Sequence, residues 1–121
     1  MNALNAFLSA DLSKTINVAI PRLGIHLKVK ALTTEEITKL NERATYGDTV
    51  DEKKLSGLVI ATASTNVDFG DQRMLDKYGA ISADECALKA LFAGEVATVV
   101  EAIMNASGFG NINDKVKQAK N

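Results

Sequence analysis

The sequence has few of the residues that build covalent or metal-bound structure. Its 121 residues include one cysteine (Cys86), one proline (Pro21), one histidine (His26) and no tryptophan. A single cysteine excludes an intramolecular disulfide and a multi-cysteine zinc site, and it is typical of a reducing compartment. A single histidine excludes a histidine-rich metal site. We therefore expect a fold held together by ordinary packing, without a metal or a cofactor.

Long apolar runs and a strongly basic character are also missing. No run of about 18 apolar residues occurs, so we expect no transmembrane helix. The N-terminus lacks a basic segment before an apolar core, so a secretory signal is not expected. Only three of the 14 basic residues are arginine and the formal net charge is -1, whereas a nucleic-acid-binding domain is more often basic. These absences favour a cytoplasmic protein that binds neither membrane nor nucleic acid.

The composition that remains is that of a globular protein. Hydrophobic residues make up 46% of the chain and charged residues 24%, which is an ordinary balance for a folded domain. A chain of this length buries enough surface for one core. We predict a single globular domain over residues 1–110. Residues 111–121 are polar apart from Ile112, Val116 and one alanine, so we predict a polar C-terminal tail there.

An alternating pattern near the N-terminus predicts a β-hairpin. Apolar and polar side chains alternate over residues 14–20 and 24–31, which is the period of a half-buried antiparallel pair. The side chains expected to point inward are Ile16, Val18, Ile20, Ile25, Leu27 and Val29. Pro21 and Gly24 favour a turn between the strands. Because a lone hairpin is marginal in water, we expect helices or another chain to cover its apolar face.

Helical patterns account for most of the remaining chain. We predict helices over residues 1–9, 34–46, 52–64 and from Asp71 to Gly79, with Thr33 and Glu36 forming a capping box. Residues 80–109 read as two further helices joined at residues 93–94, capped by Ser82 with Glu85 and stopped at Gly108. The predicted fold class is α+β, mostly α, with an N-terminal β-hairpin packed against four to five helices.

Two features are candidates for chemistry, and both have simpler interpretations. Cys86 lies near the start of its predicted helix, where the helix dipole lowers a thiol pKa, but a close helix contact explains the small residues around it more simply. His26, Lys28 and Lys30 share the polar face of the hairpin. They form either a surface for an acidic partner or protection for an exposed edge strand.

Other constellations typical of enzymes are missing or explained by structure. The carboxylate pairs Glu35-Glu36 and Asp84-Glu85 lie in first helical turns, where capping accounts for them. The glycines match neither a phosphate-binding loop nor a dinucleotide fingerprint. From the residues alone we therefore predict only a small, mostly helical domain that binds a partner.

The order of short segments along nearly the whole chain resembles the XkdN-like tail assembly chaperones of phages and phage-like elements. The matching segments are residues 6–8, 30–36, 67–69, 75, 78–80, 91–95, 107–109 and 119–121. Asn66 departs from the pattern, since a proline is expected before the Asp68-Phe69 pair.

The resemblance implies a protein that is not an enzyme and has no small-molecule substrate. It implies a chaperone that binds the tape measure protein and keeps it soluble while the tail is built. It implies action in the host cytoplasm, absence from the finished tail, and a further contact with the tail tube protein. Related genes often yield a longer product by frameshifting, and the ending Ala119-Lys120-Asn121 is compatible with a slippery heptamer, A-AAA-AAC. The alternative is a structural or adaptor protein of the virion, such as a head–tail joining or tail component. A small nucleic-acid-binding regulatory module is a third, weaker alternative.

The candidate partner-binding residues are apolar side chains of the last third of the chain. They are Leu91, Phe92, Phe109, Ile112 and Val116. In this hypothesis residues 80–109 form the rigid base, the polar tail with Ile112 and Val116 helps to engage the client, and self-association into a homo-oligomer stays open.

Overall fold

A β-hairpin and a group of helices form the body of the chain in a computed structural model that describes residues 2–109. The hairpin consists of β1 (Thr15–Ile20) and β2 (Ile25–Lys30), joined by a 3-10 turn over Pro21–Leu23. The helices of the body are α2 (Thr34–Arg43), α3 (Glu52–Ala63), α4 (Gln72–Tyr78), α5 (Ala83–Ala90) and α6 (Ala93–Ala106). The predicted fold class, α+β and mostly α with an N-terminal hairpin, is confirmed.

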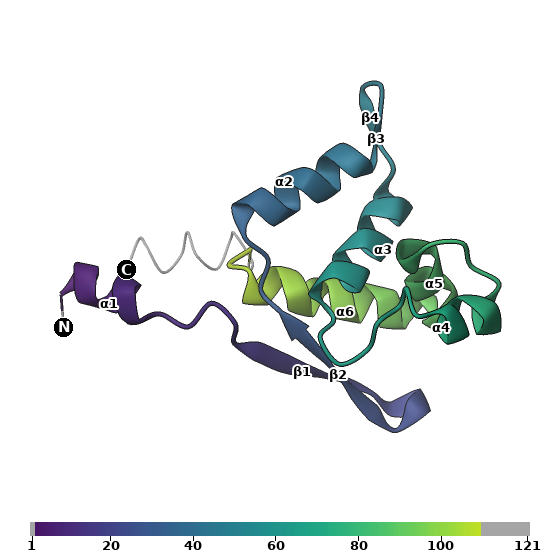
Figure 1. Cartoon of the computed structure of the whole chain (residues 1–121), viewed down its shortest axis with the longest axis horizontal. Coiled ribbons are helices and arrows are strands. Elements are labelled where there is room, and N and C mark those ends of the chain that lie inside the picture. Colours follow the sequence, from purple (N-terminus) through teal and green to yellow (C-terminus); the bar gives the residue numbers. More distant parts are fainter. Residues whose placement is uncertain (1, 110–121) are drawn as a thin grey trace.

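The predicted N-terminal helix is present but lies apart from the body. Helix α1 (Ala3–Ser9) is connected to β1 by residues 10–14 and projects outward (Figure 1). None of its residues is buried, and Phe7 remains 82% exposed. A helix of this length is not expected to be stable alone in water. Its apolar side chains are thus left without a partner in the described part of the chain.

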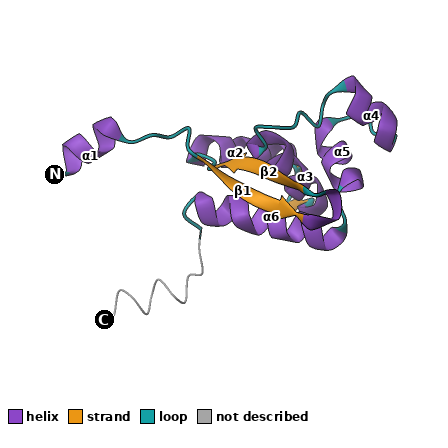
Figure 2. Ribbon diagram, turned by 90° about the horizontal axis from the view of Figure 1, so that it is seen from below, coloured by secondary structure: helices purple, strands orange, loops and turns teal. Residues whose placement is uncertain are grey.

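The hairpin lies across α6 and α3 and packs one face on them (Figure 2). The strands pair antiparallel without a bulge, with Val18 opposite Leu27 and Asn17 opposite Lys28. Four of the six side chains predicted to point inward are buried: Val18, Ile20, Leu27 and Val29. The prediction is wrong for the other two. Ile16 is 39% exposed and Ile25 is 43% exposed, although their cross-strand partners Val29 and Ile20 are buried. At each end of the hairpin the body therefore covers the side chain of one strand only.

Helix α3 is the centre of the core. It packs against α2, α5, α6 and β2, and residues Gly57–Ile60 are buried consecutively, around the whole helix. Helix α5 approaches closely at Gly57, where a Cβ atom on the glycine would lie 2.5 Å from the backbone oxygen of Asp84. Cys86 of α5 is fully buried in this contact region. The close-packing interpretation of the small residues in α5 is thereby confirmed.

The prediction for the end of α2 is wrong. The helix ends at Arg43, and the chain forms a small hairpin of β3 (Thr45–Tyr46) and β4 (Thr49–Val50). Gly47, the residue that follows the predicted helix, has a positive φ of 62° in the turn of this hairpin. Gly-Asp is a favoured two-residue hairpin loop, so a local signal for this turn was present in the sequence.

The predicted junction between α5 and α6 also needs correction. Helix α5 ends at Ala90, and Phe92 rather than residue 94 precedes α6. Gly94 lies in the first turn of α6, where its α-carbon faces open space. Ser82 makes no side-chain capping bond, and Glu85 instead accepts a hydrogen bond from the backbone N–H of Ile81 at 3.3 Å. The break arises where Leu91 turns inward to the core, which periodicity alone does not reveal.

The predicted stop at Gly108 is confirmed. The N–H of Phe109 donates to the carbonyl of Met104 at 2.9 Å, and that of Gly108 donates to Asn105 at 3.1 Å. This pair of bonds, with a φ of 92° at Gly108, is a Schellman motif. One residue earlier, the hydroxyl of Ser107 accepts from the backbone N–H of Leu32 at 2.8 Å. The end of α6 is thus tied to the segment between β2 and α2.

Candidate partner-binding site

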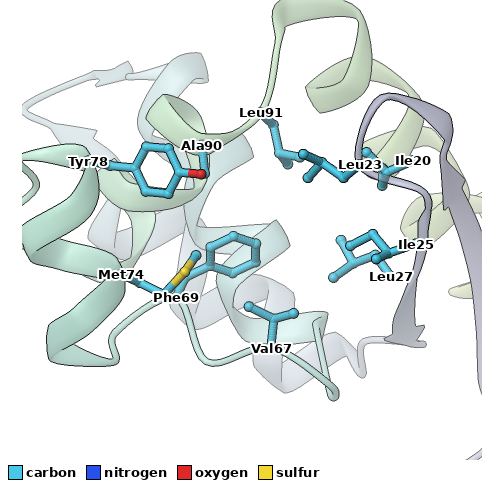
Figure 3. Close-up of a pocket in the computed structure, with 10 residues that line it drawn as sticks. All are labelled: Ile20, Leu23, Ile25, Leu27, Val67, Phe69, Met74, Tyr78, Ala90 and Leu91. Carbon is cyan, nitrogen blue, oxygen red and sulfur yellow. The ribbon is translucent and has the colours of Figure 1, made fainter.

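An apolar pocket opens between the tip of the β1–β2 hairpin and helix α4 (Figure 3). Its volume is about 200 Å³. Four separate segments line it: the hairpin tip, the loop before α4, α4 itself and the end of α5. The lining residues are Ile20, Leu23, Ile25, Leu27, Val67, Phe69, Met74, Tyr78, Ala90 and Leu91. The Tyr78 hydroxyl is the only side-chain oxygen or nitrogen among them, so the pocket suits apolar groups.

The wall opposite the hairpin is fixed by the loop before α4. Phe69 is 4% exposed and anchors this loop in the core. The Asp68 carboxylate accepts from the N–H of Gly70 at 2.8 Å, and Asp71 caps α4 by accepting from the N–H of Arg73 at 2.9 Å. The turn and the cap together orient Met74 and Tyr78 toward the pocket.

A single arginine holds the hairpin tip against α5 and α6. The guanidinium of Arg22 donates to the carboxylate of Glu95, with an Nη2–Oε1 distance of 2.8 Å, and to the carbonyl of Ala90 at 3.0 Å. It also stacks 4.0 Å above the centre of the Phe92 ring. Glu95 in turn accepts from the N–H of Phe92 at 2.7 Å, which caps α6. The clamp fixes the pocket edge formed by the hairpin.

The ionisation of the clamp follows from these contacts. The hydrogen bond from Arg22 lowers the pKa of Glu95 below its ordinary value, and the hydrogen bond from the N–H of Phe92 adds a smaller contribution in the same direction. The same contact with Glu95 raises the pKa of Arg22. Both groups therefore stay charged over the neutral range, and the clamp remains an ion pair.

The predicted partner-binding residues fall into two places. Leu91 is 7% exposed and lines the apolar pocket, while its neighbour Phe92 is 64% exposed beneath Arg22. Phe109 is 59% exposed at the opposite end of α6, about 20 Å away for a helix of this length. Ile112 and Val116 lie outside the described residues. The structure brings Leu91 and Phe92 together, and Phe109 does not join them.

Sequence reasoning missed the two exposed side chains at the pocket mouth, Leu23 and Ile25. Leu23 is 47% exposed, and it sits in a turn, where an apolar residue is unusual. An apolar residue in a turn could therefore have indicated a binding surface from the sequence alone. No sequence signal indicated the Arg22–Glu95 pair, because the two residues are 73 positions apart.

The residues considered for chemistry take no part in this site. His26 is exposed on the outer face of the hairpin. Burial raises the pKa of the Cys86 thiol, which disfavours the thiolate that a reactive cysteine needs. Within residues 2–109, no three histidine, cysteine or acidic side chains lie close enough together to hold a metal ion. None of the described helices is both long and apolar enough to span a membrane.

The fold is shared with a solved protein. The crystal structure of the protein YqbN superimposes on this chain with a TM-score of 0.69 at 18% sequence identity, covering 90% of this chain and 98% of YqbN. At that identity the likeness establishes the fold alone. No curated protein sequence matches the chain.

The family comparison covers nearly the entire sequence. Residues 4–120 match the model of the phage XkdN-like tail assembly chaperone family. That range includes the apolar pocket, the arginine clamp and both ends of α6. This chain therefore belongs to the XkdN-like family of phage tail assembly chaperones.

Proposed function

We propose that the chain binds the phage tape measure protein during tail assembly and keeps it soluble until the tail tube forms around it. The observation that carries the proposal is the apolar pocket between the hairpin tip and α4. It admits apolar side chains of a client helix, with Leu23 and Ile25 exposed at its mouth. Recognition of this kind uses apolar anchors spaced along one helix face.

The size and lining of the pocket support a protein client over a small molecule. Sites for small molecules are usually larger, roughly 300–1,000 Å³, and contain several convergent polar groups. This pocket is about 200 Å³ and offers one hydroxyl, that of Tyr78. It fits one or two apolar side chains. The rest of the client helix would lie on the surface around the pocket mouth.

Co-expression with the tape measure protein tests the proposal. We expect wild-type chain to move the client into the soluble fraction, and Leu23→Lys or Ile25→Lys to reduce that fraction strongly, because a charge would enter an apolar mouth. Ile81→Lys is the matched control, since Ile81 is 89% exposed and does not line the pocket. Circular dichroism verifies that each variant is folded. Equal client solubility with all three variants would exclude the pocket as the binding site.

The remaining parts of the proposal concern the assembly context. The chain would act in the host cytoplasm, contact the tail tube protein and be left out of the finished tail. Mass spectrometry of purified tails separates this from the alternative of a structural or adaptor protein, which predicts stoichiometric presence of the chain in the tail.

The C-terminal residues are tested separately. Deletion of residues 111–121 should weaken client binding if Ile112 and Val116 take part, and undiminished binding would remove them from the site. A frameshifted longer product requires an A-AAA-AAC heptamer at codons 119–121, and sequencing the gene decides that point.

A further inference from the structure

The two outer edges of the hairpin differ in their hydrogen bonding. The edge of β2 is covered, because the carbonyl of Lys28 accepts from the N–H of Thr65 at 2.8 Å and its N–H donates to the Asn66 side chain at 2.9 Å. Asn17 pairs with Lys28 in the antiparallel ladder. The backbone groups of Asn17 therefore point the opposite way, to the outer edge of β1, as do those of Thr15 and Ala19. No group within residues 2–109 hydrogen-bonds to the outer edge of β1.

The open edge of β1 also lacks the usual protection. Natural sheets guard exposed edges with lysines, prolines or bulges, whereas β1 is the uncharged segment Thr-Ile-Asn-Val-Ala-Ile with a continuous register. Protection of an exposed edge was one expected role of Lys28 and Lys30. Both lysines lie on β2, the strand whose edge is covered. The edge of β1 is left available for pairing.

A shallow groove continues from this edge along the start of α6. It is lined by Ala19, Ile20, Pro21, Phe92, Gly94, Glu95 and Thr98. The segment that precedes β1 carries an exposed apolar side chain of its own, since Leu12 is 80% exposed. The chain thus presents a shallow groove beside one end of β1 and an exposed leucine just before the other end.

We propose that two copies of the chain pair antiparallel through β1 about a two-fold axis, with Leu12 of each copy in the groove of the other. A two-fold pair brings the same edge from both copies together, and an uncharged strand has no like charges to oppose this. In a register centred on Asn17, Thr15 of one copy faces Ala19 of its partner. The chain before Thr15 then runs past the partner's Ile20 and Pro21 toward the partner's Phe92.

The lengths of the segments agree with this arrangement. Leu12 lies three residues before Thr15, a reach of about 10 Å in extended chain, so it arrives near the groove beside Pro21. Pairing also joins two two-stranded sheets into one of four strands, and sheets of three or more strands are more stable than lone hairpins. Helix α1 would continue over the partner's body, which accounts for its having no buried residue among residues 2–109 of its own chain.

Light scattering across a range of protein concentrations tests the pairing. We expect a mass of about twice 12.9 kDa for the full chain and at least a tenfold weaker dimer for Asn17→Lys, because two lysines would meet at the two-fold axis. His26→Lys puts the same charge on the covered strand and should leave the dimer unchanged. A wild-type chain that stays monomeric throughout, or an Asn17→Lys dimer as strong as wild type, would overturn the proposal.

Cysteine cross-linking tests the position of Leu12. Leu12→Cys and Thr98→Cys variants, mixed and oxidised, should form a disulfide between the two chains, and buried Cys86 does not compete. A chain that carries both substitutions serves as the comparison. If a disulfide forms only within that chain, Leu12 lies in the groove of its own copy, and its placement in the partner's groove is wrong. The dimer and the proposed function are tested separately. Client solubility is measured with Leu23 and Ile25 variants, which leave the edge of β1 intact, so either proposal can fail without the other.

Discussion

The covered edge of the β1–β2 hairpin and its open edge show how a two-stranded sheet is made stable on one side only. On the covered side, the Asn66 amide accepts from the N–H of Lys28 and donates to the carbonyl of His26 at 3.0 Å. One side chain thereby supplies both bonds that a neighbouring strand would supply. On the open side, β1 offers the same backbone groups with no partner among residues 2–109. The asymmetry leaves one edge free for another chain without exposing both.

The same contrast extends to the helices on the two sides. Helix α3 lies behind β2 and is buried around its whole circumference at residues 57–60. Helix α1 is attached to β1 and buries none of its residues. Stability should therefore be concentrated on the covered side, whereas the open side should respond mainly to association.

The largest expected difference between the two sides comes from core truncation. Ile60→Ala on α3 should lower the free energy of unfolding by about 2–5 kcal/mol, because Ile60 is fully buried and a cavity would remain. Leu12→Ala should change that of the monomer by less than about 0.5 kcal/mol. Urea denaturation at high dilution measures both. Similar losses for the two variants would show that the open side is part of the cooperative core.

A smaller effect is expected at the helix contact of the covered side. Gly57→Ala should destabilise by about 1–3 kcal/mol, because its methyl group would meet the Asp84 backbone, which has little room to move. Gly94→Ala is the matched control in a helix. Apart from the adjoining backbone of its own helix, no atom lies within 4 Å of the added methyl group there, so that variant should be neutral or up to about 1 kcal/mol more stable. Thermal unfolding compares the pair, and equal shifts in Tm would contradict close packing at Gly57.

The two edges are compared directly by a pair of asparagine substitutions. Asn66→Ala should cost about 1–2 kcal/mol, because the N–H of Lys28 and the carbonyl of His26 lose their partner. Asn17→Ala should cost less than about 0.5 kcal/mol in the monomer. Hydrogen exchange at the Lys28 amide should accelerate in the first variant alone. Unchanged exchange would mean that Asn66 does not cover the β2 edge.

Local rules predicted the parts of the fold that depend on neighbouring residues. Alternation located both strands of the first hairpin. Thr33 caps α2 and Gly79 ends α4 as expected. The α5–α6 junction was misplaced because Leu91 leaves the helix to enter the core. Its position depends on packing with distant segments rather than on the residues beside it.

The candidate site was predictable only in part. Leu91 was named from a family resemblance, but the pocket that it lines joins segments from residue 20 to residue 91. No periodic pattern connects segments so far apart. Asn66 also could not be recognised from the sequence. It stands where the family pattern has a proline, and a polar residue is ordinary in a loop. Its role at the β2 edge appears only when residues 26–28 and 66 are brought together.

The smallest expected effect concerns the clamp that joins the open side to α6. Because Arg22 and the Phe92 N–H lower the pKa of Glu95 in the folded chain, the folded state binds fewer protons at this carboxyl than the unfolded state. Its contribution to stability is therefore present above the unfolded pKa of about 4.3 and is lost as the pH falls through the lower folded value. Glu95→Gln should flatten the dependence of Tm on pH below about pH 5, where the unfolded carboxyl begins to bind protons. Glu101→Gln, at an exposed position of the same helix, is the control. If both variants follow the wild-type slope, the Arg22–Glu95 pair does not hold the hairpin tip in solution, and the pocket edge is fixed by apolar packing alone.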